Sequence, residues 1–411
     1  MAFRPTWQSL DRQTQINLGI SFGIGWLFWT CMACQLPVIP LYADSLGASA
    51  DQVGWVMGAF AVGLLLFRSR LGRQSDQLGR VQVMRVGLLV ATIIPLYYAL
   101  FPAIPLLFVF RAVHGISIAA FATSFNAFVA DLAPLKHRGE LVGYMSLVNP
   151  LGVGLGPILG DWLRTEWHFA TVFCGASLLG ALGFALTWLL RERRTNLGAD
   201  ALPKYQLWRS WGHPRVRTPA LVLLLIGLSF GSLSTFMPLF LRQEQIPINS
   251  GWFYLSAAIA GVLVRLPLAN WSDRWGRGMF VSIGICGYAS SMWLMYNAQS
   301  PLAVLISGAL EGTGAGFVIP SIITIVADRT TKLERGYIIG LVWSGFDVGI
   351  ALAGPVVGGL VKQLGLQTAF AVATGLSLLA LLVFLTQSSG NVGRSWRFAT
   401  GRGQDVFALD G

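Results

Sequence analysis

Residues 71–80 read LGRQSDQLGR and residues 268–277 read LANWSDRWGR, so the frame S-D-x-x-G-R occurs twice. Each copy concentrates charge in a chain of which only 11% of the residues are charged. The two copies lie at an offset of 197 residues, and each follows an apolar stretch. Scarce charges placed twice in one pattern indicate that the chain consists of two related halves.

The rest of the chain extends this internal repeat. Identical residues recur at the same offset in the pairs Gly54/Gly251, Arg68/Arg265, Asp76/Asp273, Gly87/Gly284, Gly115/Gly312, Asp131/Asp328 and Gly143/Gly340. The offset drifts to 198 where Gly156-Pro157 meets Gly354-Pro355, and to 200 where Gly175 meets Gly375. Parallel repeats of this kind build many transporters.

Hydropathy predicts an all-α membrane protein. The hydrophobic fraction is 54% and the mean hydropathy is +0.63, and runs of about 20 apolar residues are long enough to cross a bilayer as helices. Twelve runs are expected, at 18–43, 52–67, 86–101, 105–130, 141–160, 168–190, 219–241, 250–264, 279–297, 302–327, 336–361 and 368–386. We therefore expect six spans in each of two pseudo-symmetric bundles.

The charge distribution predicts the domain boundaries and the orientation. With a cytoplasmic N-terminus, 25 of the 29 Lys and Arg residues fall in the termini or in loops after even-numbered spans, which is the positive-inside bias. We expect a bundle at 1–190, a basic cytoplasmic linker at 191–218, a second bundle at 219–386 and a disordered cytoplasmic tail at 387–411. The protein is thus predicted to be a multi-pass protein of the plasma (inner) membrane with both termini inside.

Several other classes of function are disfavoured. The net charge of +11 is spread over these loops, whereas a nucleic-acid-binding protein gathers its basic residues on one soluble domain. No G-x-x-x-x-G-K-[ST], G-x-S-x-G or H-E-x-x-H motif is present, which argues against ATP use and against an enzyme. Cys31 and Cys34 form a C-x-x-C pair inside an apolar span, where packing is favoured over redox chemistry. We expect no metal and no cofactor.

The repeated frame resembles the signature G-x-x-x-D-R-x-G-R of the major facilitator superfamily. Its matching residues are Gly72, Asp76, Gly79 and Arg80 in the first half and Asp273, Arg274, Gly276 and Arg277 in the second. Gln77 replaces the usual Arg, and Ala269 replaces the first Gly of the second copy. The resemblance implies a short cytoplasmic loop that latches the two halves in the outward-open state. An aspartate there can cap a neighbouring helix or pair with arginine.

Polar side chains inside the spans are candidates for proton coupling or for the substrate cavity: Arg111, His114, Glu311, Asp347, Asn149 and Gln35. Ionisable groups in a membrane are costly and usually line a pathway. His114 is the repeat equivalent of Glu311, and Asn149 that of Asp347. A structural ion pair between the halves is the alternative interpretation of the acids, and snorkelling is the alternative for Arg111.

The fifth span contains Gly152, Gly156, Pro157 and Gly160. These residues resemble the G-x-x-x-G-P-x-x-G signature associated with antiporters of the same superfamily. Glycines at every fourth position also allow two helices to pack closely without any role in exchange.

The favoured function is secondary transport of a small organic molecule by alternating access, resembling the twelve-span drug/proton antiporters and driven by protons. A symporter or uniporter that imports a nutrient is the alternative within transport, and a non-transporting receptor is the alternative from another class. Aromatic residues of the expected cavity spans hint at an amphipathic or apolar solute, although lipid contact would use the same residues: Trp26, Trp29, Phe121, Phe125 and Phe236. A monomer would suffice, and the sequence leaves the oligomeric state open.

Overall fold

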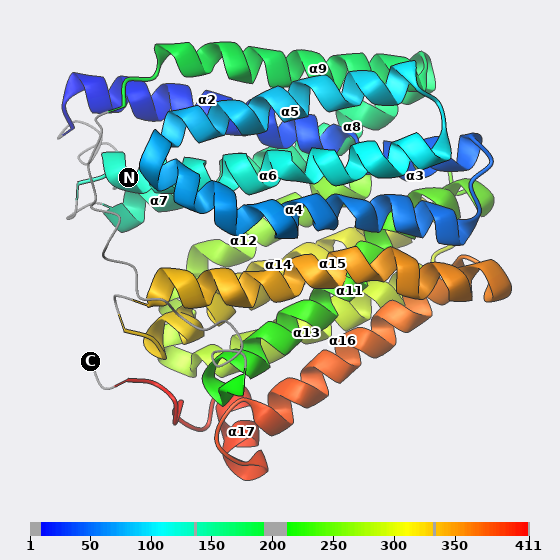
Figure 1. Cartoon of the computed structure of the whole chain (residues 1–411). Helices are drawn as coiled ribbons and strands as arrows, with labels where there is room; N and C mark the ends of the chain where they lie inside the picture. Colours follow the sequence, from blue (N-terminus) through cyan, green and yellow to red (C-terminus); the bar gives the residue numbers. More distant parts are fainter. Residues whose placement is uncertain (1–9, 135–137, 193–211, 332–333, 410–411) are drawn as a thin grey trace. The chain divides into compact units, whose positions relative to one another are not determined.

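The computed structural model describes residues 10–134, 138–192, 212–331 and 334–409. All of the regular structure in these ranges is helical (Figure 1). Contacts divide the chain into two compact units, the first with Met1–Leu46 and Ala59–Leu202 and the second with Gly47–Gly58 and Pro203–Gly411. The expected linker falls mainly on 193–211, which lies outside the described residues.

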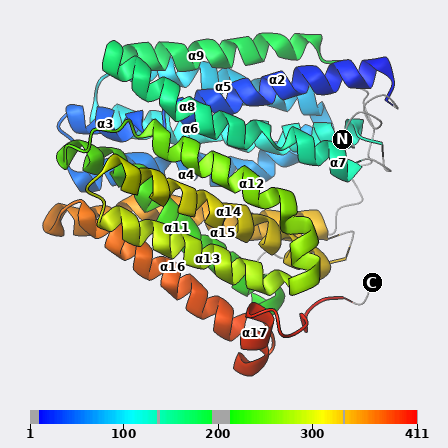
Figure 2. The same cartoon turned by 180° about the vertical axis from the view of Figure 1, so that it is seen from behind.

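Unit 1 contains the helices of the first half of the repeat, and Figures 1 and 2 show them from opposite sides. They are α2 (Arg12–Cys34), α3 (Val38–Ser45), α4 (Ala50–Leu78), α5 (Arg80–Leu100), α6 (Ile104–Leu132), α7 (Arg138–Met145), α8 (Val148–Glu166), α9 (Phe169–Leu186) and the 3₁₀ turn η2 (Thr187–Leu189). The first residues of α4 group with unit 2 by contacts. Helix α2 packs against α8 and α9, and α5 packs against α6 and α9.

Unit 2 contains α11 (Pro214–Gln243), α12 (Gly251–Trp275), α13 (Arg277–Tyr296), α14 (Pro301–Asp328), α15 (Arg335–Leu364), α16 (Gln367–Gln387) and α17 (Val392–Ala399). Its helices pair as their repeat equivalents do in unit 1. Helix α11 packs against α15 and α16, and α13 packs against α14 and α16. The internal repeat of the sequence is therefore also a repeat of helix packing.

The spans differ in detail from the apolar runs. Among the described residues, eleven helices are long and apolar enough to cross a membrane, and the apolar part of α12, Gly251–Leu266, is shorter. The run expected at 18–43 is broken into α2 and α3 around Gln35 and Pro37. Proline cannot donate the backbone hydrogen bond that would continue a helix. The all-α membrane fold is confirmed, while the count of twelve remains a prediction.

Glycines bring the helices of each unit into backbone contact at equivalent places. A methyl group on Gly115 of α6 would overlap the carbonyl oxygen of Phe60 on α4. A methyl group on Gly312 of α14 would overlap the carbonyl oxygen of Ala257 on α12. Both pairs are related by the offset of 197, so the repeated glycines mark repeated helix crossings.

A second pair of glycines shows the same correspondence. A methyl group on Gly87 of α5 would lie 2.7 Å from the carbonyl oxygen of Ser117, and one on Gly284 of α13 would lie 2.9 Å from that of Gly314. Lipid tails are as apolar as the side chains, so the hydrophobic effect does not drive membrane helices together. Close contact between backbones provides the packing energy instead.

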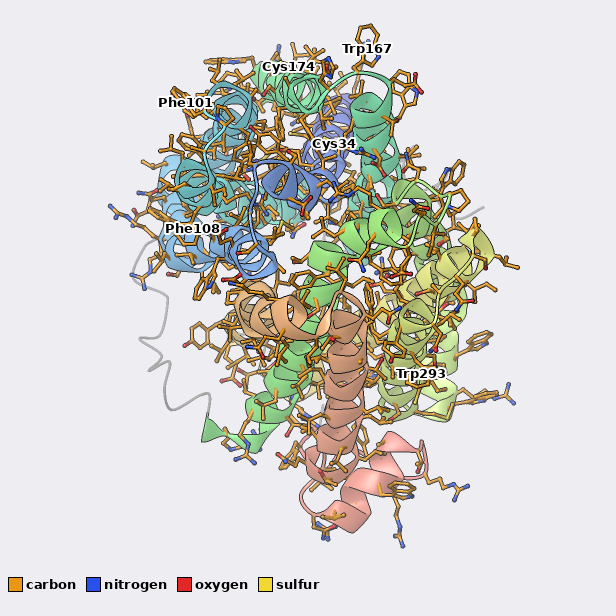
Figure 3. All side chains as sticks on the ribbon, turned by 90° about the vertical axis from the view of Figure 1, so that its right-hand side faces the viewer. Cys34, Phe101, Phe108, Trp167, Cys174 and Trp293 are labelled. Atoms are coloured by element: carbon orange, nitrogen blue, oxygen red, sulfur yellow. The ribbon has the colours of Figure 1, made fainter. Side chains whose placement is uncertain are left out.

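The outer surface of both units is apolar, as a membrane protein requires. Figure 3 shows Phe101 and Trp167 at the surface of unit 1 and Trp293 at the surface of unit 2, with exposed fractions between 46% and 64%. Cys34 lies inside unit 1 (Figure 3) and donates to the carbonyl oxygen of Cys31 at 3.2 Å. Both thiols are free and buried, in agreement with a packing role for this pair.

The C-terminal tail is folded where the sequence suggested disorder. Helix α16 ends at Gln387 and α17 begins at Val392, with the side chain of Asn391 accepting a hydrogen bond from the Arg394 amide as its N-cap. The residues that follow α17 are described as far as Leu409. Composition rich in Gly, Ser and Arg suggested disorder, but Phe398 and Ala399 of the tail are buried.

The glycine crossings lead to the first prediction. We expect Gly115→Ala and Gly312→Ala each to lower the free energy of unfolding by about 1–3 kcal/mol, because the added methyl group must displace backbone atoms. Thermal unfolding of the purified protein in detergent measures the effect.

Gly375→Ala is the matched control, because nothing lies within 4 Å of the methyl group it would add to α16. It should change stability by less than about 1 kcal/mol, and in the stabilising direction, since alanine is the better helix former. Equal unfolding temperatures for Gly115→Ala and Gly375→Ala would contradict the close crossing.

Candidate functional site

A buried polar cluster lies within unit 1. Arg111 and His114 are three residues apart on α6 and therefore lie on one face of that helix. Their exposed fractions are only 7% and 1%. The hydroxyl of Tyr98, from α5, lies 2.9 Å from Nδ1 of His114, and the Arg111 guanidinium stacks over the ring of Phe60 at 4.5 Å from its centroid. A buried arginine held by an aromatic face is a cation–π arrangement.

The hydrogen bonds of this cluster are incomplete. Nε of Arg111 and Nε2 of His114 are buried and have no hydrogen-bond partner in the structure. A buried polar group without a partner costs about 1–3 kcal/mol. The hydroxyl of Tyr98 can donate to a neutral imidazole or accept from a protonated one. The unpartnered nitrogen atoms of Arg111 and His114 are therefore available to a further polar group.

Unit 2 contains a second buried cluster, around Glu311 of α14. The Glu311 side chain is 6% exposed, and Tyr288 of α13 is 1% exposed. The Tyr288 hydroxyl hydrogen-bonds to the Glu311 carboxylate, and the Arg265 guanidinium from α12 interacts electrostatically with it. Because Glu311 is the repeat equivalent of His114, each unit sets a tyrosine hydroxyl against the same position.

The sequence did not indicate these tyrosines. Tyr98 and Tyr288 are not equivalent at the offset of 197, since Tyr288 corresponds to Ala91. Each belongs to a helix rich in apolar residues, where an aromatic residue is ordinarily part of the packing. Their apolar surroundings and near-zero exposure are visible only once α5 and α13 are placed beside α6 and α14.

Gln35 and Asn149 do not join the cluster on α6. Gln35 ends α2, with Nε2 donating to the Cys31 carbonyl oxygen at 2.9 Å and Oε1 buried without a partner. Asn149 lies in the first turn of α8. A methyl group on Gly152 of α8 would contact Trp29 of α2, and one on Gly160 would contact Cys34, the residue before Gln35. Gln35 therefore lies beside Gly160, which is about 16 Å along α8 from Asn149.

Asp347 lies on α15 and is 7% exposed. Helix α15 packs chiefly on α11, where Gly227 approaches the carbonyl oxygen of Phe346, the neighbour of Asp347. The backbone next to Asp347 therefore takes part in a tight contact between α15 and α11.

Two of the aromatic residues considered for a substrate cavity belong to the core of unit 1. The ring of Phe121 stacks on Phe28 with 3.9 Å between centroids, and Phe125 stacks on Phe121 at 5.3 Å.

A separate hollow of about 430 Å³ on α4 is lined by Ser69, Arg70, Arg73, Gln74 and Gln77 and shares no residue with either cluster. Among the described residues no group of His, Cys, Asp or Glu could hold a metal ion.

The S-D-x-x-G-R frame is helical rather than a loop. Helix α4 continues to Leu78 and α5 starts at Arg80, so Gly79 alone joins them. Its φ of 106° is open only to glycine without strain. Gly276, with φ 87°, joins α12 to α13 in the same way. The expected loop is therefore a one-residue joint in both units.

The arginine that follows each joint is held by carboxylates. Arg80 pairs with Asp76 one turn earlier, and its Nε lies 3.2 Å from Oδ2 of Asp131 at the end of α6. In unit 2, Arg277 pairs with Asp328, the repeat equivalent of Asp131. The side chain of Asp273 lies outside the described part of the structure, and Arg274 is exposed. Each frame thus ties the start of one helix to the end of another.

The N-terminus of α5 is capped by an acid that the sequence did not single out. The carboxylate of Glu192 accepts from the backbone N–H of Arg80 at 2.5 Å and from that of Val81 at 3.2 Å. Asp76, which was considered for such a cap, bonds the Arg80 side chain instead. Glu192 is more than 100 residues away in sequence, in a run of charges that resembled solvated linker.

The glycine motif of α8 makes helix contacts. Methyl groups added to Gly152, Gly156 and Gly160 would each come within 3 Å of backbone or side-chain atoms of α2. Pro157 lies inside α8 without ending it. The motif therefore holds α8 against α2, which is the packing role that its spacing allows.

The Glu192 cap can be tested directly. We expect Glu192→Gln to lower the free energy of unfolding by about 0.5–2 kcal/mol, the usual contribution of a helix cap. Glu166→Gln is the control, because this exposed acid ends α8, where a negative charge is unfavourable to the helix dipole. An equal or larger loss of stability in the control would speak against the cap.

Comparisons with known proteins agree with this architecture. The family model of the Major Facilitator Superfamily matches residues 21–279 and 247–400. The chain is 25% identical over 368 residues to the staphylopine export protein of Staphylococcus aureus, covering 87% of this chain and 92% of that protein. It is 26% identical over 378 residues to multidrug resistance protein 1 of Bacillus subtilis, covering 87% of this chain and 91% of that protein.

Solved structures with the same fold include the nucleoside transporter NupG, with a TM-score of 0.75, 16% identity and coverage of 90% of this chain and 98% of that one. A bacterial homologue of the human lysosomal transporter Spinster has a TM-score of 0.71 at 14% identity, covering 95% of this chain and 97% of that one. At these identities the likeness concerns the fold alone.

Proposed function

Because the chain belongs to the major facilitator superfamily, we propose that it exports a small organic molecule by alternating access in exchange for protons. Membership makes it a multi-pass membrane transporter of a small-molecule substrate. Two relatives are an export protein and a multidrug resistance protein, and their names support the outward direction. The observation that carries the proton coupling is the buried carboxylate of Glu311 beside Tyr288 and Arg265.

Glu311 has the chemistry of a site for which proton and substrate compete. An ionised carboxylate in an apolar helix needs a positive neighbour or a hydrogen bond, and Arg265 and Tyr288 supply both. Protonation removes the charge but leaves an oxygen that can still accept from Tyr288. A cationic group of a substrate would satisfy the ionised form equally well. One carboxylate that holds either a proton or a cation exchanges the two.

Arg111 serves as a fixed charge in this proposal, because arginine does not lose its proton in proteins. The unpaired Nε–H of Arg111 can donate a hydrogen bond to a polar group of the substrate. The unpaired Nε2 of His114 can donate or accept one, depending on the tautomer. The superfamily resemblance makes α6 and α14 cavity helices, which is why these two clusters are preferred over Asp347. Positive-inside charge supports cytoplasmic placement of both termini and both S-D-x-x-G-R frames.

The coupling predicts that Glu311→Gln abolishes uphill accumulation driven by a pH gradient while substrate binding and downhill exchange persist. Glutamine retains an oxygen for Tyr288 but cannot titrate. The measurement is flux in proteoliposomes with an imposed pH gradient, using a hit from a thermal-shift ligand screen as substrate.

Asp347→Asn is the comparison variant and should impair binding and uphill transport together, since Asp347 is buried and lies next to the tight contact between α15 and α11. If Glu311→Gln still accumulates substrate against its gradient, the proton site is elsewhere and His114 is the next candidate. An inward-directed proton symporter or a uniporter would be recognised in the same assay by co-directional proton movement or by none. A receptor would bind the hit without flux.

We also propose that the S-D-x-x-G-R frames act as a conformational latch. Asp76→Asn should shift the protein away from the outward-open state by roughly two- to fivefold, because a charge at a helix end contributes about 0.3–1 kcal/mol. The effect should be partial, since Asp131 still holds Arg80. Accessibility of engineered cysteines to an impermeant thiol reagent measures the shift.

Asp76→Glu retains the charge and should stay close to the native distribution. Unchanged accessibility and unchanged flux in Asp76→Asn would reduce the frame to a structural joint.

A further inference from the structure

The C-terminal segment 388–409 is fixed to unit 2 by one buried arginine. Arg329, at the end of α14, is 2% exposed. Its Nε and Nη2 donate to the carboxylate of Asp405 at 2.7 and 3.0 Å, and Nη2 also donates to the Ser388 carbonyl oxygen at 2.7 Å. The amide of Leu409 donates to the Asp328 carbonyl oxygen at 2.9 Å. The acidic charge of the segment is thus neutralised inside the protein.

Helix α17 is fixed to the same unit by one face only. Phe398 and Ala399 are buried, and Ser282 of α13 donates to the Ala399 carbonyl oxygen at 2.9 Å. A methyl group on Gly278 of α13 would contact the carbonyl group of Phe398. These contacts fix the rotation of α17 about its own axis, so the opposite face of the helix stays exposed.

The exposed face of α17 is basic and aromatic. Arg394, Trp396 and Arg397 are exposed on it, and Arg402 is exposed just after it. At the end of α12, Arg274 and Trp275 are also exposed. This second pair lies beside the tail, because a methyl group on Gly401 would contact the Trp275 carbonyl oxygen. We call these six residues the basic aromatic face.

The position of α17 places this face at the surface of the bilayer. Only the residues between Gln387 and Val392 separate it from α16, a membrane-spanning helix, and α17 runs across the end of that helix (Figure 1). Tryptophan is enriched at the level of the lipid headgroups, and arginines beside it attract anionic lipids. An amphipathic helix in the membrane plane has this distribution of residues.

We propose that the basic aromatic face binds the headgroups of anionic phospholipids in the leaflet next to α17. The charges favour phospholipids with a net negative charge, and the tryptophans favour a ligand with both an apolar and a polar part. The proposal concerns lipid binding and is independent of the substrate and of the direction of transport.

The experiment is native mass spectrometry of the full chain in detergent, titrated with phosphatidylglycerol or with phosphatidylcholine. We expect tighter binding of phosphatidylglycerol and a weakening of at least about tenfold in the variant Arg394→Gln/Arg397→Gln, since each arginine near an anionic surface contributes roughly fivefold. Both side chains are exposed, so the unfolding temperature should not change. Arg394→Lys/Arg397→Lys retains the charge and should retain most of the affinity.

The control is Arg242→Gln/Lys362→Gln, which removes two exposed cationic side chains near the C-terminal ends of α11 and α15, one of them paired with Asp51, and should leave the phosphatidylglycerol affinity unchanged. Equal affinity for the two lipids, or native affinity in Arg394→Gln/Arg397→Gln, would overturn the proposal. Displacement of phosphatidylglycerol by millimolar inorganic phosphate would also overturn it, because the face would then be a general anion site.

Discussion

Backbone contact between helices at glycine is the constraint on which both units depend. In lipid, apolar side chains gain little by leaving the solvent, so helices associate through close packing and internal hydrogen bonds. Gly115 and Gly312 allow α6 and α14 to touch the carbonyl groups of α4 and α12. These same two helices position His114 and Glu311. The polar clusters are therefore held at depths set by the glycine crossings, and a shift of the crossing would move the titratable groups as well.

The two clusters show how a duplicated scaffold acquires different chemistry. Equivalent positions carry an imidazole in unit 1 and a carboxylate in unit 2, and each is met by a tyrosine from a non-equivalent position. The fixed cation also differs, since Arg111 lies on the same helix as His114 whereas Arg265 comes from α12. Packing is conserved between the units because it depends on glycine and the backbone, while polar contacts differ because side chains of several lengths can reach one point.

Much of the fold could be predicted from the sequence, because hydropathy and the glycine repeat depend on residues that are near in sequence or at a constant offset. The break at Gln35, the one-residue joints at Gly79 and Gly276 and the cap by Glu192 could not. The first two depend on backbone angles, and the cap depends on a contact over more than 100 residues. Of the candidate site, Arg111 and His114 were among the candidates and lie three residues apart on α6, but their partner Tyr98 was missed because an aromatic residue in a membrane helix carries no distinguishing pattern.

The ion pair of Arg329 and Asp405 has a consequence for the synthesis of the protein. The two residues are 76 positions apart, so at about 5–20 residues per second a ribosome needs roughly 4–15 s to reach the second after the first. During this interval α14 is already apolar enough to enter the membrane, while Arg329 at its end still lacks its counter-ion. Water and lipid headgroups must solvate the guanidinium until Asp405 emerges. Unit 2 can therefore be completed only after all of its spans have been synthesised, and chains that stop before residue 405 would reach the membrane with a cation that the folded protein buries.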